Sequence, residues 1–232
     1  MRPQISVMIG VYNAAPYLGD AIESVLAQDY DPIELIVVDD GSDDGSAEVA
    51  RAYPEVRYFF QENQGNGGAR NTAVAAAGGE LFAFLDADDR FTPGKLALQK
   101  AALDADPSLD MVFGHVREFL SPELDEETRN ALRPPAPEPM PWTAPNLMLI
   151  RRRSFERVGP FSSTLRVGVT VDWFARASEA GLRYEILPDV VLERRLHTQN
   201  NGLRERDARS QYLQVIRAAL ERRRAASETP EA

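Results

Sequence analysis

Short runs of apolar, mostly β-branched residues alternate with stretches of helical periodicity through the first half of the chain. The apolar runs, expected as strands, fall at residues 5–11, 33–38, 56–60 and 81–85, and the helical stretches between them at 16–28, 46–53 and 67–77. Alternation of this kind is typical of βαβ units, whose parallel strands are joined by helices. We therefore expect an α/β fold with a mostly parallel, Rossmann-like central sheet flanked by helices.

The second half of the chain is less regular. Residues 121–141 are rich in Glu and Pro, a composition that excludes a regular helix or central strand and predicts a loop or lid. The elements expected around this segment are helices at 92–103 and 171–180 and strands at 111–116, 146–150, 184–187 and 190–196. An amphipathic helix at 204–226 is expected to serve packing or a homodimer contact.

The composition excludes several classes of protein. The 232 residues include no cysteine and two histidines, which rules out disulfide scaffolds, zinc–cysteine sites, thiol catalysis and multi-histidine metal sites. A formal net charge of -10 argues against nonspecific binding to nucleic acid or to anionic membranes. No apolar run approaches the roughly 20 residues of a membrane span. We expect a cytoplasmic protein, with at most peripheral membrane association through arginine runs at 151–153 and 222–224.

Polar side chains follow three of the expected strands at the point where each strand ends. They are Tyr12 and Asn13 after the first strand, Asp39 and Asp40 after the second, and Asp86, Asp88 and Asp89 after the fourth. The carboxyl ends of parallel strands meet at one edge of an open sheet, so these groups should lie together. Converging carboxylates repel one another unless a cation lies between them, and oxygen ligands suit Mg²⁺ or Mn²⁺. One acidic turn alone, such as residues 39–42, is equally typical of a helix cap.

Four short segments together carry a family resemblance. They read SVMIGVYN at 6–13, VVDDGS at 37–42, GARN at 68–71 and FLDADD at 84–89. In this order they resemble the nucleotide-sugar-binding half of family 2 glycosyltransferases, which have the GT-A fold. The resemblance covers about the first 115 residues and continues more weakly to about residue 202. It implies a nucleotide-sugar-binding half at 1–115, an acceptor-binding and catalytic half of the same domain at 116–202, and a C-terminal helix and tail at 203–232.

The resemblance also implies roles for individual residues. By the resemblance, the nucleotide is bound by Tyr12, Asp39, Asp40, Arg70 and Asp86. A Mn²⁺ or Mg²⁺ ion is bound by Asp88, Asp86 and His197. Asp86 and Asp88 resemble the DxD motif of the family, and residues 195–197 resemble its Arg-x-His segment.

The acceptor side is marked by Asp172. In the family a Glu-Asp pair begins a helix and its Asp is the catalytic base; here Asp172 matches the Asp and Val171 replaces the Glu. A helix N-terminus stabilises an ionised carboxylate, which suits a base, although a plain N-cap is the alternative. Trp142 and Trp173 are the aromatic residues expected to contact an acceptor.

Together these features predict a metal-dependent, inverting glycosyltransferase. It would use a nucleotide-diphospho-sugar, with a UDP-sugar as the first expectation, and an acceptor hydroxyl of a glycan, lipid-linked sugar, peptide or small molecule. Two alternatives remain. A nucleotide-sugar-binding partner subunit without transferase activity would keep the same motifs. A sugar nucleotidyltransferase is disfavoured because residues 12–16 are not a glycine-rich, basic phosphate loop.

Overall fold

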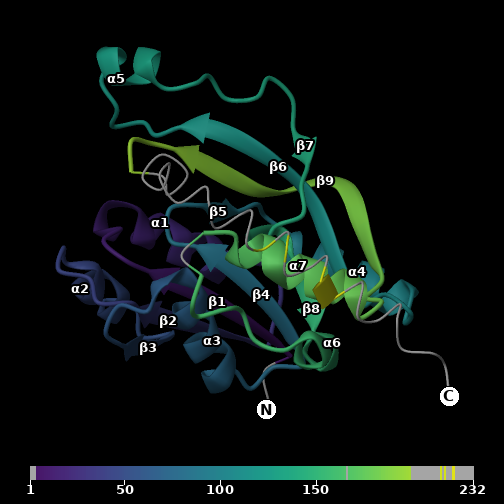
Figure 1. Cartoon of the computed structure of the whole chain (residues 1–232). Coiled ribbons are helices and arrows are strands. Elements are labelled where there is room, and N and C mark those ends of the chain that lie inside the picture. Colours follow the sequence, from purple (N-terminus) through teal and green to yellow (C-terminus); the bar gives the residue numbers. More distant parts are fainter. Residues whose placement is uncertain (1–3, 166, 200–214, 216, 218–220, 223–232) are drawn as a thin grey trace, which may run out of the picture.

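The parallel half of the molecule begins as the alternating pattern predicts. The computed structural model describes residues 4–165 and 167–199, together with residues 215, 217, 221 and 222. Its first elements are β1 (Ile5–Val11), α1 (Ala15–Leu26), β2 (Ile33–Asp39), α2 (Ser46–Arg51), β3 (Val56–Phe60), α3 (Gly65–Ala76) and β4 (Leu81–Asp86). β1 pairs in parallel with β2 and β4, and β2 with β3, so all four strands end at one edge of the sheet (Figure 1).

The second half extends this sheet with strands of mixed direction. Its elements are β5 (Arg90–Phe91), α4 (Lys95–Ala105), β6 (Met111–Leu120), α5 (Glu126–Ala131), β7 (Met140–Pro141), the 3₁₀ turn η1 (Pro145–Leu147), β8 (Leu149–Arg151), α6 (Arg152–Val158), α7 (Val169–Glu179) and β9 (Tyr184–Leu196). Among the described residues the strands run β3-β2-β1-β4-β8-β6-β9-β5, with β7 paired to β6. β8 is antiparallel to both β4 and β6, which joins the two predicted halves in one sheet.

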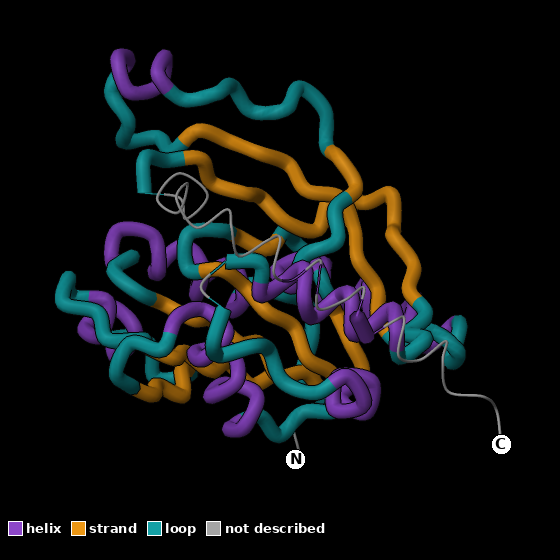
Figure 2. The backbone as a smooth tube through the Cα atoms, in the orientation of Figure 1, coloured by secondary structure: helices purple, strands orange, loops and turns teal. Residues whose placement is uncertain are grey.

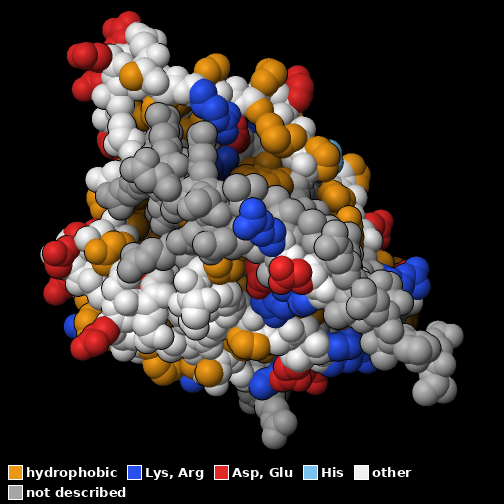
Figure 3. All heavy atoms as spheres, viewed as in Figure 1, with side chains coloured by type: hydrophobic (Ala, Val, Ile, Leu, Met, Phe, Trp, Pro, Cys, Tyr) orange, Lys and Arg blue, Asp and Glu red, His pale blue; other side chains and the backbone are white. Residues whose placement is uncertain are grey.

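β6 and β9 form an arm that extends beyond the parallel half (Figure 2). They pair in parallel over their length, with a register shift around Gly114. A Cβ at Gly114 would lie 2.6 Å from a methyl group of Val191, so glycine permits the close approach of the two strands there. The tip of the arm carries α5, where Figure 3 shows acidic side chains gathered on the surface; the sequence gives Asp125, Glu126 and Glu127 at this place.

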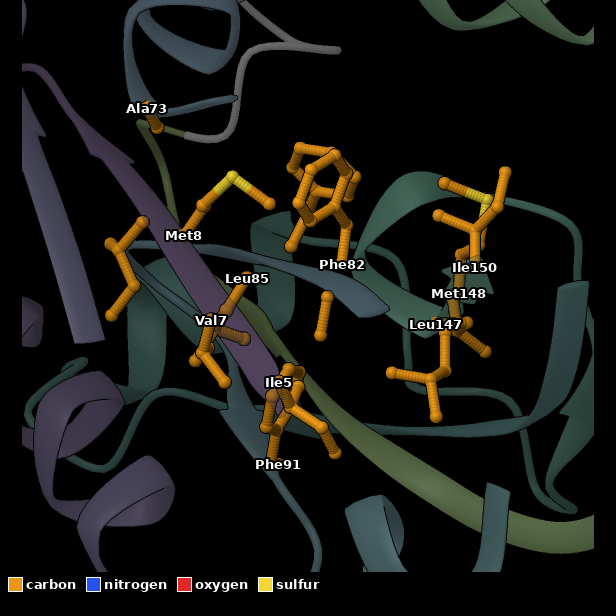
Figure 4. Close-up of a cluster of buried hydrophobic side chains, with 14 of the residues drawn as sticks. Ile5, Val7, Met8, Ala73, Phe82, Leu85, Phe91, Leu147, Met148 and Ile150 are labelled. Atoms are coloured by element: carbon orange, nitrogen blue, oxygen red, sulfur yellow. The ribbon is translucent and has the colours of Figure 1, made fainter. Parts of the chain in front are cut away.

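A continuous apolar core lies between the sheet and its helices. Figure 4 shows side chains of β1 and β4, among them Val7, Phe82 and Leu85, beside Leu147 and Ile150 of η1 and β8. Each is at most 2% exposed. Full burial of one large apolar side chain stabilises a fold by about 1.5–3 kcal/mol. The core therefore fixes the strand ends that carry the polar clusters.

Several boundaries differ from the sequence predictions. The strand expected at 146–150 is a 3₁₀ turn followed by the short β8, because Pro145 favours the first turn of a helix rather than a central strand. The two strands expected at 184–187 and 190–196 are one strand, β9. The predicted loop at 121–141 contains α5 and β7. Most of the helix expected at 204–226, with its homodimer contact, lies outside the described residues.

The described part of the chain has no helix that is both long enough and apolar enough to cross a membrane.

Candidate functional site

A cavity of about 1060 Å³ opens at the carboxyl edge of the parallel strands. Its walls come from the loops after β1, β2 and β4, the first turns of α3, the segment before α7, and the end of β9. The lining residues include Tyr12, Tyr17, Asp40, Asn63, Gln64, Arg70, Asp86, Asp88, Asp89, Thr164, Leu165, Val167, Thr170, Val171, Arg194, His197 and Gln199. Three polar clusters that the sequence places at separate strand ends therefore share one cavity.

Tyr12 lies on the cavity wall with half of its surface exposed. The next residue, Asn13, has φ of 51°, a left-handed backbone conformation that is uncommon for residues with a Cβ. Two hydrogen bonds fix this turn: the Asn13 N–H donates to Ser42 Oγ (3.0 Å), and the Asp43 N–H donates to Asn13 Oδ1 (2.9 Å). The loop after β2 thus holds the loop after β1, and the Tyr12 ring is presented to the cavity.

Asp39 is fully buried at the end of β2 and does not line the cavity. Its carboxylate accepts the Ser42 N–H (2.8 Å) and the Tyr58 hydroxyl (2.9 Å). Burial of the phenol, followed by its bond to Asp39, raises the pKa of Tyr58 to about 12. One carboxylate oxygen binds the loop after β2 and the other binds β3, so the structure does not bring Asp39 into contact with the cavity.

Asp40, by contrast, lies on the cavity wall and closes the N-terminus of α3. One oxygen accepts the Gln61 side-chain amide (2.6 Å) and the Gln64 N–H (2.9 Å), and the other accepts the Gly65 N–H (2.8 Å). The N–H groups of Gln64 and Gly65 are backbone donors at the start of the helix, which have no partner within it. Asp40 therefore joins the loop after β2 to the helix that carries Arg70.

Arg70 and Asp86 form a partly buried ion pair at the cavity, in which the arginine is buried and the carboxylate is partly exposed. Arg70 is 6% exposed, its Nη2 lies 2.7 Å from Asp86 Oδ1, and its guanidinium lies over the Phe161 ring at 5.5 Å. The helix reaches this position because Gly67 has no Cβ, which would lie 2.3 Å from the Ser162 carbonyl oxygen. Arg70 and the loop after β4 at residues 86–89, called the acidic loop below, are separate in the sequence and are thus brought together.

Asp89 is the buried member of the acidic loop. Its carboxylate accepts the Arg195 N–H (3.0 Å) and the Asn146 side-chain amide (2.8 Å). Burial raises the pKa of Asp89 well above its ordinary range, and the neighbouring Asp88 and Asp86 add to the rise. Asp89 therefore supports the loop from inside the protein.

Asp88 and His197 meet at the cavity. Asp88 Oδ2 lies 2.9 Å from His197 Nε2, and the imidazole lies against the Tyr17 ring, with centroids 4.5 Å apart. The Arg195 Nε donates to the Asp88 carbonyl oxygen (3.1 Å), so β9 holds both residues of the pair. The Arg-x-His segment predicted from the sequence thus reaches the DxD loop.

The described residues contain no group of three Asp, Glu, His or Cys side chains arranged to hold a metal ion. Asp88 and His197 nevertheless provide one oxygen and one nitrogen ligand side by side. Mg²⁺ is usually held by one or two carboxylates with substrate phosphates and waters, and imidazole nitrogen also suits transition metals. The donor set therefore fits a Mn²⁺ or Mg²⁺ ion whose coordination a diphosphate completes. Asp86 is less available, because its oxygens accept from Arg70 and Asn146.

Asp172 lies in the first turn of α7, below the cavity wall that Thr170 and Val171 form, and is not one of the lining residues. Its Oδ2 accepts the Arg176 Nε (3.0 Å), and its Oδ1 lies 3.7 Å from Arg222 Nη1. Only 13% of its side chain is exposed. The structure thus places the predicted base near the cavity but turned toward two guanidinium groups.

The two tryptophans predicted as acceptor contacts have different surroundings. Trp173 is fully buried, stacks on Phe155 with centroids 5.4 Å apart, and donates its indole N–H to the Gly159 carbonyl (2.9 Å). The acceptor contact predicted for Trp173 is therefore wrong, because the ring belongs to the core. Trp142 is 38% exposed, and the Arg194 guanidinium lies 5.0 Å from its ring centroid.

Sequence reasoning missed Arg194 and Tyr17 of the cavity wall and the amide of Asn146 beneath it. Arg194 directly precedes the Arg-x-His segment. Its position in a strand next to that segment could have indicated that it lies at the site. Tyr17 lies one helical turn after the polar turn that follows β1. Asn146 had no signal, because the 3₁₀ turn that carries it was predicted as a strand.

The comparisons with known proteins agree with this architecture. Residues 6–169 match the family described as Glycosyl transferase family 2. In structure, the chain is similar to S. aureus TarS residues 1–349 in complex with UDP (TM-score 0.71, 19% identity, covering 93% of this chain and 65% of that one). It is equally similar to the mannosyltransferase PcManGT from Pyrobaculum calidifontis in complex with GDP-Man and Mn²⁺ (TM-score 0.71, 24% identity, covering 95% and 65%). The fold is that of the GT-A glycosyltransferases, and the predicted fold class is confirmed.

Proteins similar to this chain in sequence are also named glycosyltransferases. Glycosyltransferase AglE from Haloferax volcanii is 32% identical over 204 residues, covering 82% of this chain and 66% of the relative. An uncharacterized glycosyltransferase from Rickettsia felis is 32% identical over 219 residues, covering 86% and 35%. The chain spans about a third of the length of several of these curated relatives. It belongs to glycosyl transferase family 2.

Proposed function

We propose that the chain transfers a sugar from a nucleotide-diphospho-sugar to an acceptor hydroxyl in a metal-dependent, inverting reaction. The observation that carries this proposal is the meeting of Arg70, Asp86, Asp88 and His197 in one cavity at the carboxyl edge of the parallel strands. Structural neighbours that bind UDP, UDP-GlcNAc and GDP-Man support a donor of this class. Membership of the family argues against the sugar nucleotidyltransferase alternative.

Four lining residues, with Asp39 behind them, have chemical tasks at the nucleotide in this proposal. The Tyr12 ring stacks on the base, and Asp40 and Asp86 face its nucleoside part, where carboxylates accept from ribose hydroxyls or base N–H groups. Arg70 offers forked donors at the boundary between nucleoside and diphosphate. Asp39 supports these groups from inside the loop after β2.

Asp88 and His197 would hold the divalent ion, and the Mn²⁺ bound to PcManGT supports such an ion in this fold. When bound, the ion stabilises negative charge on the departing nucleoside diphosphate. The protein's own contribution is to orient Asp88 through β9, because Arg195 binds the Asp88 backbone and His197 its side chain.

Asp172 is the proposed base that takes the proton of the acceptor hydroxyl. A general base must come within hydrogen-bond reach of that proton, and such bonds are often long before substrates bind. For Asp172 to act, its carboxylate must turn from Arg176 toward the wall formed by Thr170 and Val171. The acceptor would then lie between this wall and Trp142, beside Arg194.

The donor is tested by a thermal-shift screen of the chain with UDP-, GDP- and dTDP-sugars, each with and without MnCl₂. We expect one nucleotide class to raise the unfolding temperature, and to do so more strongly with Mn²⁺. Product formation is then followed by mass spectrometry with extracts as the acceptor source. A screen in which no nucleotide sugar stabilises the protein contradicts the proposal.

A further inference from the structure

Asn146 connects two carboxylates of the loop after β4. It lies in η1 and is 5% exposed. Its Nδ2 amino group carries two hydrogens, and it lies 3.1 Å from Asp86 Oδ2 and 2.8 Å from Asp89 Oδ2. One buried side chain thus donates to both carboxylates, although it does not line the cavity itself.

This contact fixes the direction of Asp86. Arg70 donates to Oδ1 of Asp86 and Asn146 donates to Oδ2, so the two oxygens are held by groups from different elements, α3 and η1. About a third of the Asp86 side chain remains exposed to the cavity. Without the amide, the carboxylate keeps one partner and is free to rotate toward Arg70. The Asp86 carboxylate would also face the neighbouring Asp89 carboxylate with no hydrogen-bond donor between them.

The turn that carries Asn146 is itself anchored by buried polar groups of α4. The carbonyl oxygen of Leu147 accepts the Gln99 Nε2 (2.7 Å) and the Lys95 Nζ (3.3 Å). Gln99 and Lys95 are 0% and 1% exposed, and they bind each other at 2.6 Å. These bonds hold η1 against α4, so the position of the Asn146 amide follows from the core and not from a surface loop.

The amide oxygen of Asn146 also indicates that this side chain is oriented by Asp86 and Asp89. Among the described residues, Asn146 Oδ1 is buried and has no hydrogen-bond partner. Leaving a buried acceptor unpaired destabilises a fold. The orientation of Asn146 is therefore explained by the two bonds that its amino group makes to Asp86 and Asp89.

We propose that Asn146 is a positioning residue for the donor: it holds the Asp86 carboxylate in the direction in which it meets the nucleotide. This inference rests on the proposed function, since it takes Asp86 as a nucleotide contact. It predicts that Asn146 acts on nucleotide affinity through Asp86. A residue that serves stability alone would lower the unfolding temperature and leave nucleotide affinity unchanged, whatever stands at position 86.

The test is a double-mutant cycle measured by isothermal titration with UDP and GDP in the presence of MnCl₂. Asn146→Leu keeps the size of the side chain and removes its donors, and it should weaken binding of the preferred nucleotide about tenfold or more. In the Asp86→Ala background the same change should alter affinity by less than about twofold, because coupled residues are not additive. Gln28→Met is the matched control: Gln28 is a buried amide bonded to Ser24 and Thr92, and its loss should leave affinity unchanged.

The inference is wrong if the Asn146→Leu protein binds the nucleotide as tightly as the Gln28→Met protein does. It is also wrong if Asn146→Leu lowers nucleotide affinity by the same factor in the unaltered protein and in the Asp86→Ala protein. If Asn146→Leu does not fold, Asn146→Ser carries the same expectations and the same contrary results, since its hydroxyl is too short to reach both carboxylates. Failure of the proposed function is distinct, because then the unaltered chain binds neither UDP nor GDP.

Discussion

At the scale of single residues, the site depends on carboxylates whose surroundings give them different tasks. Asp39 and Asp89 are buried and bonded within the protein, whereas Asp86 and Asp88 retain exposure to the cavity. Asp172 differs from all four, because two arginines surround it on the far side of the cavity wall. A shared residue type therefore does not imply a shared role.

Replacing Asp172 tests the proposed base. Asp172→Asn keeps an oxygen that accepts from Arg176 but removes the basic carboxylate, so we expect transfer to fall by about 10²–10⁴-fold while nucleotide affinity stays unchanged. Glu179→Gln is the control, since it also removes an ion pair with Arg222 at the far end of α7. Radiolabel transfer and titration calorimetry measure the two effects. An Asp172→Asn enzyme with full activity rejects Asp172 as the base.

Lys95 is a fully buried amine, so its protonation should make the stability of the fold depend on pH. Burial lowers the pKa of this amine to about 7, from 10.5. Above pH 7 the unfolded chain binds a proton that the folded chain does not, so stability should rise with pH between about 7 and 10.5. Relative to Lys95→Met, the unaltered protein should gain about 2 kcal/mol between pH 7 and pH 9. Urea unfolding at the two pH values measures this, with Lys100→Met as the control; equal pH dependence in the protein and Lys95→Met contradicts the burial argument.

At the scale of elements, the sequence predicted the parallel half well because its periodicity is local. β1 to β4 follow their apolar runs, and the polar residues at their ends predicted that the loops after β1, β2 and β4 would meet. The second half depends on contacts between distant segments. β9 is continuous because β6 pairs along it, and η1 is held by side chains of α4, which no local pattern records. The burial of Trp173 was missed for the same reason.

The segment at 121–141 is fastened to the arm through Glu118. This carboxylate is 3% exposed and accepts Arg133 Nη1 (2.7 Å), Arg194 Nη1 (3.1 Å) and the Ala136 N–H (3.1 Å). The bonds to Arg133 are the main reason that the pKa of Glu118 lies below its ordinary value of 4.5. The segment predicted as a loop or lid is thus tied to β6 and, through Arg194, to the cavity wall.

Removing this carboxylate should release the segment. We expect Glu118→Gln to destabilise the protein by about 1–2 kcal/mol and to speed proteolytic cleavage within residues 121–141. Because the pKa of Glu118 is lowered on folding, its contribution is complete above pH 4.5 and is lost as the pH falls through the folded value. Urea unfolding and limited proteolysis at pH 7 measure the effect, with Glu127→Gln on the exposed α5 as the control. Cleavage at the control rate contradicts the role of Glu118.

At the scale of the whole molecule, one sheet joins the half with parallel strands to the half with strands of mixed direction, and residues of both halves line the cavity. Of the 36 acidic residues, Asp40, Asp86, Asp88 and Asp89 gather on its wall. Arg70 and Arg194 lie among them, so the cavity wall carries both carboxylates and guanidinium groups. The net charge of -10 says little about this site, because the site is locally mixed in charge.

We propose above all that this cavity binds a nucleoside diphosphate with a divalent ion held by Asp88 and His197. Isothermal titration of the whole chain with UDP and GDP, with MnCl₂ and with EDTA, tests it most directly, alongside Asp88→Asn. We predict that one nucleotide binds in Mn²⁺, more weakly in EDTA, and that Asp88→Asn loses the difference between the two conditions. Binding of neither nucleotide, or binding that neither EDTA nor Asp88→Asn alters, would contradict the account.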